Sequence, residues 1–255
     1  MRTLLAALLA ALPAVARAQC DPAQATCAHA RAAVTQPAVK PGGQTYNWGQ
    51  GDPGTIHAVF EKTAGGAKKN KFVQENQGWF SKLIGRDPSI EAKVELSKDY
   101  LPDDSPAVVG TDADGDPVVK VGRAALDATQ SEGEMAFLLG HELHHTVARK
   151  RKMVCLNLGV KARGSTSAVK DSPELKKYRV DLEREADAWG QKYAADAGYN
   201  PLAAVDAIRH VNDLGEALGA ETGTDAEHDS YTLREEQLKK FGGAPFEAAC
   251  PWPAS

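Results

Sequence analysis

Apolar residues recur at helical spacing after residue 131, and this segment is the clearest structural signal in the chain. Ser131 is followed three residues later by Glu134, which is the capping-box pattern of a helix N-terminus. Large apolar side chains then follow mostly three or four positions apart, as one buried helix face requires. We therefore predict a helix over residues 132–149, with a buried face formed by Met135, Leu138, Leu139, Leu143 and Val147.

A second helix is predicted over residues 172–198 and a third over residues 201–214. Ser172 is a suitable N-cap, and Pro173 fits the first turn of a helix because its missing N–H group needs no partner there. Gly198 ends the second helical pattern, and an Asn-Pro pair opens the third.

A last helix is predicted near the C-terminus. Thr232 and Glu235 form a second possible capping box, and Gly242 marks the expected end. The segment over residues 155–171 is polar, basic and long for a connection. Such segments are often mobile and functional, and we predict a loop there.

Residues 106–122 show a strand pattern instead of a helical one. Two short β-branched runs flank an Asp/Gly turn, which predicts a β-hairpin. The acidic turn resembles a calcium loop, but Pro117 stands where an EF-hand requires glycine, so we interpret it as a hydrophilic turn. Residues 55–84 carry a weaker helical pattern that is interrupted at Gly65-Gly66.

The N-terminus has the features of a secretory signal peptide. Residues 1–18 combine an early arginine, a short apolar stretch and a small-residue cleavage site, and the apolar run is too short to span a bilayer. Residues 19–54 lack a sustained period and are expected to be a flexible segment, with Tyr46 and Trp48 packing onto the domain. Residues 55–255 are then expected to form one domain of an exported protein, periplasmic or secreted.

Charge and cysteine content narrow the possible partners. The formal net charge is −4, and it becomes −6 once Arg2 and Arg17 leave with the signal peptide. This balance argues against nucleic acid or an anionic membrane as the main partner, and no other stretch is apolar enough for a membrane span. Four cysteines in an exported chain predict disulfides, of which three pairings are possible. The sequence makes no prediction of the oligomeric state.

The predicted helix over residues 132–149 contains the motif HELHH, which fits the zinc-binding pattern HExxH. His141 and His145 are four residues apart, so both imidazoles lie on one helix face and converge on one zinc ion. Glu142, beside the first ligand, is placed to act as a general base toward water. His144 is rotated off the ligand face, and we interpret it as an ordinary polar helix residue.

Two histidines leave zinc short of ligands, so a third protein ligand is expected. The metzincin pattern HExxHxxGxxH is excluded, because Ala148 and Arg151 occupy the required positions. The alternative is a glutamate from a second helix, and Glu183 lies in the predicted helix 172–198. Asp187, one turn later on the same face, is expected to accept a hydrogen bond from a ligand histidine, with His141 favoured over His145.

These motifs together resemble those of the HtpX-like and CaaX-prenyl-protease superfamily of gluzincin metallopeptidases. The resemblance rests on HELHH, on Glu183, Ala186 and Asp187 in the pattern ExxAD, and on the turn Gly198-Tyr199-Asn200-Pro201. It covers roughly residues 105–241. It implies an α+β fold, namely a mainly helical, zincin-like domain with a small antiparallel sheet or hairpin beside the active-site helix. It also implies one Zn²⁺ per chain.

The resemblance further implies a late pair of catalytic residues, His228 and Arg234, which are six positions apart in HDSYTLR. Both are candidate donors to the oxyanion that forms during peptide hydrolysis. Alternatives stay open for both residues. His228 is alternatively a surface loop residue or a ligand that blocks the zinc ion, and Arg234 is alternatively a charged residue on a helix face.

We therefore expect a zinc endopeptidase that hydrolyses misfolded or unassembled cell-envelope proteins as extended polypeptide substrates. The alternative is a non-cleaving, zinc-stabilised chaperone or scaffold for such proteins. Residues 118–121, the second strand of the hairpin, are expected to offer the strand edge that pairs with substrate. Cys155 and Cys250 are hypothesised to form a disulfide that holds the C-terminal tail, which leaves Cys20 and Cys27 to pair or remain free.

Overall fold

The structure is a computed structural model of residues 1–255. It describes residues 38–39, 45–46, 53–68, 92–97, 101, 106–113, 116–217, 230–241 and 246–252. The predicted signal peptide, both early cysteines, Trp48 and His228 lie outside these described residues. The side chain of Tyr46 is not described either, so its predicted packing stays a prediction.

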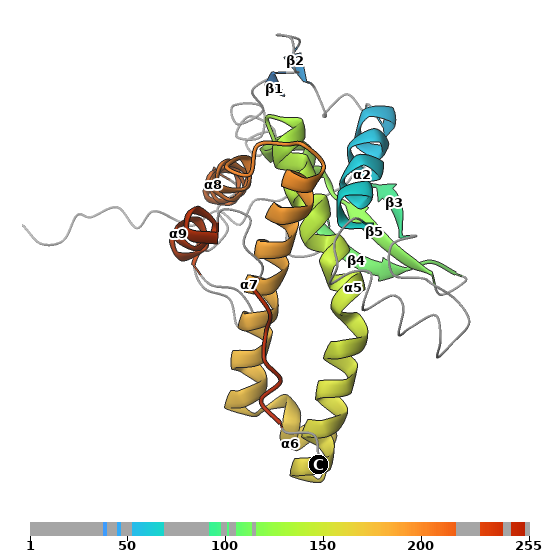
Figure 1. The fold of residues 1–255 in the computed structure, drawn as a ribbon, viewed down its shortest axis with the longest axis vertical. Helices are drawn as coiled ribbons and strands as arrows, with labels where there is room; N and C mark the ends of the chain where they lie inside the picture. The colour runs from blue at the N-terminus through green and yellow to red at the C-terminus, as the bar shows by residue number, and fades with distance from the viewer. Residues whose placement is uncertain are drawn as a thin grey trace, which may run out of the picture.

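The described part of the chain is mostly helical and carries a small sheet at one side, in line with the predicted α+β class (Figure 1). Two long helices, α5 and α7, run side by side through the molecule. The helices are α2 (Pro53–Lys68), α4 (Arg123–Ala128), α5 (Glu132–Arg163), α6 (Thr166–Lys170), α7 (Pro173–Asp196), α8 (Ala203–Ala217) and α9 (Tyr231–Phe241).

The predicted hairpin is present as strands β4 (Ala107–Thr111) and β5 (Pro117–Val121), which pair antiparallel. A third strand, β3 (Lys93–Leu96), pairs parallel with the other side of β5, so the sheet is mixed and its order is β3-β5-β4. Because β5 is the central strand, the prediction that it offers an edge to substrate was wrong. A separate two-stranded ladder joins β1 (Ala38–Val39) to β2 (Thr45–Tyr46).

The acidic turn of the hairpin is closed by hydrogen bonds between Asp112 and Asp116. The backbone N–H of Asp112 donates to the Asp116 carbonyl at 2.9 Å, and the N–H of Asp116 donates to Asp112 Oδ1 at 2.9 Å. Lys93 of β3 forms an ion pair with Asp112. These contacts fit the interpretation of a hydrophilic turn.

Helix α5 starts where the sequence predicts but runs much further. The side chain of Ser131 accepts a hydrogen bond from the Glu134 N–H at 3.2 Å, and all five predicted core positions of the helix are buried. The helix continues to Arg163, and α6 follows at once, so the loop predicted over residues 155–171 was wrong. Packing against α7 and the C-terminal tail explains the extra turns, because tertiary contacts outweigh weak local propensity.

The remaining helix boundaries agree closely with the sequence analysis. Ser172 caps α7 by accepting from the Leu175 N–H at 3.1 Å, and Gly198 follows the helix with a left-handed φ of +88°. Helix α9 is capped by Ser230 instead of Thr232, since the Leu233 N–H donates to the Ser230 hydroxyl.

The core lies between α5, α7, α8, α2 and the sheet. Gly65-Gly66 does not interrupt α2, and Gly66 lets this helix lie against the backbone of α7. Among the described residues, no helix is long and apolar enough to cross a membrane. The largest fully buried side chains include Phe137, Leu139 and Leu143 of α5, Tyr178 and Tyr193 of α7, Ile56 of α2 and Ile208 of α8.

Candidate metal centre

The three predicted zinc ligands meet between α5 and α7. The Nε2 atoms of His141 and His145 lie 3.1 Å apart, and Oε2 of Glu183 lies 3.3 Å from the first nitrogen and 3.4 Å from the second. The histidines come from successive turns of α5, and the glutamate comes from the facing side of α7. A nearly equilateral triangle of ligand atoms therefore stands between the two helices.

The dimensions and chemistry of this triangle fit a zinc ion. Two imidazole nitrogens and one carboxylate oxygen form a common zinc donor set with bonds of about 2.0–2.2 Å. The edges of a tetrahedron with such bonds are about 3.3–3.5 Å long, close to the three separations in the structure. Three protein ligands also leave one position for water or substrate, which is the pattern of a catalytic zinc site.

Two glycines allow α5 and α7 to approach each other beside the ligands. A Cβ atom on Gly140 would lie 3.0 Å from the carbonyl oxygen of Gly190 and 3.1 Å from its Cα. These distances are shorter than nine in ten contacts of real Cβ atoms, so a side chain at Gly140 would push against the backbone of α7. The missing side chains thus bring Glu183 of α7 within reach of the histidines of α5.

Asp187 lies behind the ligands and orients His141. The Nδ1 atom of His141 donates to Asp187 Oδ1 at 2.9 Å, the contact that the four-residue spacing predicts. With the proton on Nδ1, the lone pair of Nε2 points to the metal position. Arg234 of α9 donates to both oxygens of the same carboxylate, from Nε at 2.8 Å and from Nη2 at 2.7 Å.

The charges in this cluster change the pKa values of its members. Burial raises the pKa of Asp187, but Arg234 and His141 outweigh burial and lower it to about 2. Burial lowers the pKa of His141, but hydrogen bonds to Asp187 and Glu183 outweigh burial and raise it to about 10. Asp187 is therefore a carboxylate at neutral pH, and a metal ion at His141 must displace a proton.

Glu142 directly follows the first ligand on α5. Its side chain is half-buried, and its negative charge acts on His141. It is not a member of the group of ligand atoms. This position beside the ligands, but outside their triangle, is the one that a general base requires.

His144 lies off the ligand face, as predicted, but it is a buried core residue. Its Nε2 atom donates to Glu185 at 2.9 Å, its Nδ1 accepts from the Tyr193 hydroxyl at 3.0 Å, and its ring stacks on Trp189. Burial lowers the pKa of His144 to about 4 and outweighs the opposing effect of Glu185. The imidazole is thus neutral, and it holds α5 against α7 one position before His145.

The C-terminal tail reaches the same buried glutamate. Glu185 accepts hydrogen bonds from the N–H of Ala248 at 2.8 Å and from Arg151. Arg151 also donates to the carbonyl oxygen of Ala248 at 2.9 Å. The predicted disulfide between Cys155 and Cys250 is present and joins the tail to α5. The tail is therefore bonded to both long helices, to α7 at Glu185 and to α5 at Arg151 and Cys155, and Figure 1 shows it running toward the end of the molecule that carries α6.

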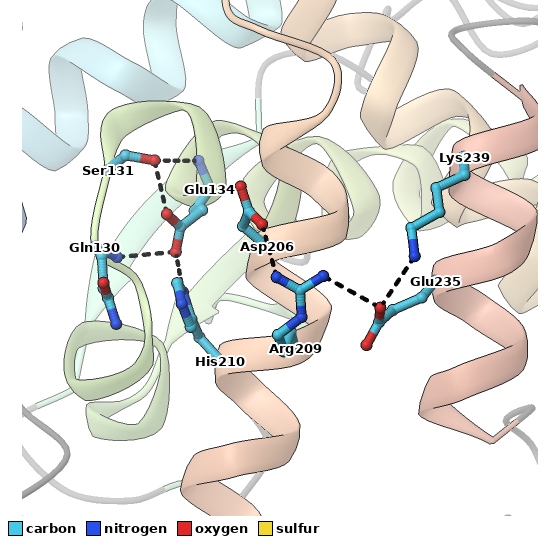
Figure 2. A network of polar contacts seen from close by, with 8 residues as sticks. All are labelled: Gln130, Ser131, Glu134, Asp206, Arg209, His210, Glu235 and Lys239. Atoms are coloured by element: carbon cyan, nitrogen blue, oxygen red, sulfur yellow. Dashed lines mark hydrogen bonds and ion pairs between the residues drawn. The ribbon is translucent and has the colours of Figure 1, made fainter.

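A second polar network holds α8 and α9 in place (Figure 2). Glu134 accepts from the Gln130 N–H and the Ser131 hydroxyl, and its Oε2 lies 2.9 Å from Nδ1 of His210 on α8. Arg209 of α8 bonds to Glu235 of α9 at 3.4 Å. These contacts link the start of α5 to the helix that carries Arg234.

Of the two predicted oxyanion donors, the structure describes Arg234. His228 lies outside the described residues, so its two proposed roles stay predictions. Arg234 points two of its donors at Asp187. The sequence analysis also missed the buried network of His144, Glu185 and Tyr193, for which the only sequence signal was the second histidine in HELHH.

No protein-family model, curated protein or solved structure matches the chain. The functional interpretation therefore depends on the residues and geometry of the site.

Proposed function

We propose that the protein is a zinc-dependent endopeptidase with a zincin-like fold, related to the HtpX-like and CaaX-prenyl-protease gluzincins. The observation that carries the proposal is the triangle of His141, His145 and Glu183, whose edges of 3.1–3.4 Å match a tetrahedral zinc site with one open position. Asp187 supports it, because a carboxylate behind a zinc-bound histidine is a usual feature of such sites.

Glu142 is the general base of the proposed reaction. A zinc ion in this site would lower the pKa of a water molecule and polarise the substrate carbonyl. Glu142 takes a proton from the attacking water and returns it to the leaving amine, so one carboxylate serves as base and then as acid. A site that only stabilised the fold would need no such residue and would usually have four protein ligands.

Asp187 and Arg234 keep the first ligand in one orientation. Asp187 holds the Nδ1 proton of His141, and Arg234 holds Asp187 in its ionised form through two hydrogen bonds. In this arrangement Arg234 is a positioning residue that acts through Asp187. A direct contact of Arg234 with the oxyanion requires one of its remaining donors.

Substrate would bind in an extended conformation along the edge of β4. This strand is one of the two edge strands of the three-stranded sheet, and unlike β3 it lies against α5, whereas β5 is paired on both sides. Pairing with a strand edge gives a peptide most of its affinity through main-chain hydrogen bonds. Unfolded or unassembled envelope proteins supply such extended segments, and the disulfide fits a protein that works outside the cytoplasm.

The test compares the wild type with Glu142→Gln. We expect the zinc-loaded wild type to cleave casein, and Glu142→Gln to lose cleavage by at least about a hundredfold while its zinc content is unchanged. Glu236→Gln, which makes the same change on α9, is the control and keeps full activity. A wild type that suppresses aggregation of unfolded proteins without cleaving them would replace this proposal with the chaperone alternative.

A further inference from the structure

The charges of the chain are strongly segregated along α5, α6 and α7. Residues 149–179, which we call the basic arm, contain ten Lys and Arg residues and two Asp and Glu residues, a net charge of +8. The whole chain has a net charge of −4, so the other 224 residues carry −12. The negative net charge of the whole chain therefore conceals a strongly positive segment.

The basic arm is the far end of the two-helix hairpin (Figure 1). It comprises the second half of α5, all of α6 and the first turns of α7, and it extends away from the sheet and from α8. Its tip, residues 161–168, is exposed throughout. The arm is held rigid by the Cys155–Cys250 disulfide and by Trp252, whose ring lies against Gly159.

Part of the positive charge on the basic arm is available to a partner, although Arg151 is paired with Glu185 and Lys177 with Asp181. Its two acidic residues are Asp171 and Glu174, and Glu174 is paired with Arg163. Among the described residues, Lys152, Lys161 and Lys170 are exposed and form no ion pair. A surface of this kind attracts anions at a distance of about one Debye length.

The basic arm also exposes large apolar side chains. Met153 is 50% exposed and Val154 is 45% exposed, which makes them two of the three large hydrophobic residues that are exposed in the described part of the chain. Met153 lies one turn after Arg149, and Lys152 directly precedes it. Exposed basic and apolar side chains are therefore neighbours on this part of α5.

We infer that the basic arm docks on the surface of an anionic lipid bilayer. Lysine and arginine side chains bind anionic headgroups, while Met153 and Val154 enter the boundary between headgroups and acyl chains. A nucleic acid or an acidic polysaccharide offers the charge but no apolar layer for these two side chains. The chain lies on the membrane in this mode and does not span it.

Docking would hold the candidate metal centre near the membrane. Met153 is eight residues after His145 on the same helix, a distance of about 12 Å at 1.5 Å per residue. The inference does not depend on the proposed protease activity, because no residue of the arm's outer face belongs to the metal site. A membrane-docked centre would meet substrates at the bilayer surface.

Vesicle flotation tests the inference on the full mature chain. We expect binding to phosphatidylcholine vesicles that contain phosphatidylglycerol, and none to phosphatidylcholine alone. Each basic side chain near the surface contributes about fivefold to binding. The triple substitution Lys152→Gln, Lys161→Gln and Lys170→Gln should therefore weaken binding by about a hundredfold. The same change at Lys68, Lys239 and Lys240, which are exposed on α2 and α9, is the matched control and should weaken binding far less.

The contribution of Met153 and Val154 distinguishes binding to an anionic bilayer from binding to other polyanions. Met153→Ser with Val154→Ser should reduce vesicle binding several-fold at unchanged charge, while Glu142→Gln and the metal-free protein bind as the wild type does. Equal binding of both lysine variants would overturn the inference. So would tight binding to heparin or single-stranded DNA without vesicle binding, or a stable dimer in sedimentation that buries Met153.

Discussion

Gly190 of α7 lies directly against the backbone of His141 on α5. A Cβ atom at Gly190 would stand 2.7 Å from the His141 amide nitrogen and 3.1 Å from the carbonyl oxygen of Phe137. The first distance is shorter than real Cβ atoms show, and the second is shorter than nine in ten real Cβ contacts. The absence of a side chain at Gly190, together with that at Gly140, therefore allows the close spacing of the two helices and with it the reach of Glu183 to the histidines.

Substitution of Gly190 by alanine should force the helices apart. We expect Gly190→Ala to lower the free energy of unfolding by about 1–3 kcal/mol, as overpacking does, and to weaken zinc binding. Urea unfolding and metal analysis measure the two effects. Gly65→Ala in α2 is the control: no atom stands within 4 Å of its Cβ position, so it should be neutral or stabilise by up to about 1 kcal/mol. Unchanged stability and zinc content in Gly190→Ala would contradict the view that Gly190 allows the close spacing of α5 and α7.

The pair Asp187 and Arg234 predicts a specific pattern of metal affinities. Asp187→Asn should weaken zinc binding by about 10–100-fold, because it removes the carboxylate that orients His141. Arg234→Gln should weaken zinc binding in the same way, and the double variant should lose little more, since both residues act through one contact. Lys239→Gln, on the same helix and exposed, is the control.

Kinetics separate this positioning role from a direct one. If Arg234 donates to the oxyanion, Arg234→Gln lowers kcat while the zinc affinity stays at the wild-type value. Competition with a chelating dye gives the affinity, and peptide hydrolysis at saturating zinc gives kcat. A loss of kcat alone would assign Arg234 to the reacting atoms.

The meeting of His141, His145 and Glu183 was predictable from sequence, in part because helical spacing is a local property. His141 and His145 share a face of α5, and Glu183 and Asp187 share a face of α7, and both pairs lie as their spacing requires. The expectation that the two pairs meet came from zinc chemistry, in which two histidines need a third protein ligand. The close contact of the helices at Gly140 was not predictable, because no local sequence pattern pairs Gly140 with Gly190 of the other helix.

The burial of His144 was not predictable, because it depends on partners 41 to 49 residues away. Glu185 and Tyr193 satisfy both ring nitrogens, and Arg151 neutralises the glutamate. A polar residue without such partners is normally exposed, so the sequence favoured the surface. The length of α5 was missed for the same reason, since its last turns depend on α7 and on the tail.

The disulfide should make a large contribution to stability. Cys155 and Cys250 are 95 positions apart, and closing a loop of this length stabilises a fold by about 2–5 kcal/mol. We expect the double variant Cys155→Ser, Cys250→Ser to unfold at a lower urea concentration by a corresponding amount. Reductant should destabilise the wild type but have no further effect on this variant. Peptide mapping that finds both residues as free thiols in the wild type would exclude the crosslink.

His210 gives the fold a pH-dependent contact between α8 and α5. Its Nδ1 atom lies 2.9 Å from Oε2 of Glu134, and this hydrogen bond raises the pKa of His210 against the opposing effect of partial burial. The charges of Glu134, Asp206 and Asp213 raise it further. The folded protein therefore holds the His210 proton more tightly than the unfolded chain does, where the pKa is about 6.5.

Proton linkage determines how the contribution of His210 to stability changes with pH. A histidine with a raised pKa stabilises the fold fully below the unfolded pKa of about 6.5, and its contribution is lost as the pH rises through the higher folded value. We expect the difference in unfolding free energy between the wild type and His210→Gln to be largest below about pH 6.5 and to shrink as the pH rises above it. Urea titrations at several pH values measure it, with His57→Gln, an exposed histidine of α2, as the control. A difference that stays constant across this range would show that Glu134 does not hold a proton on His210.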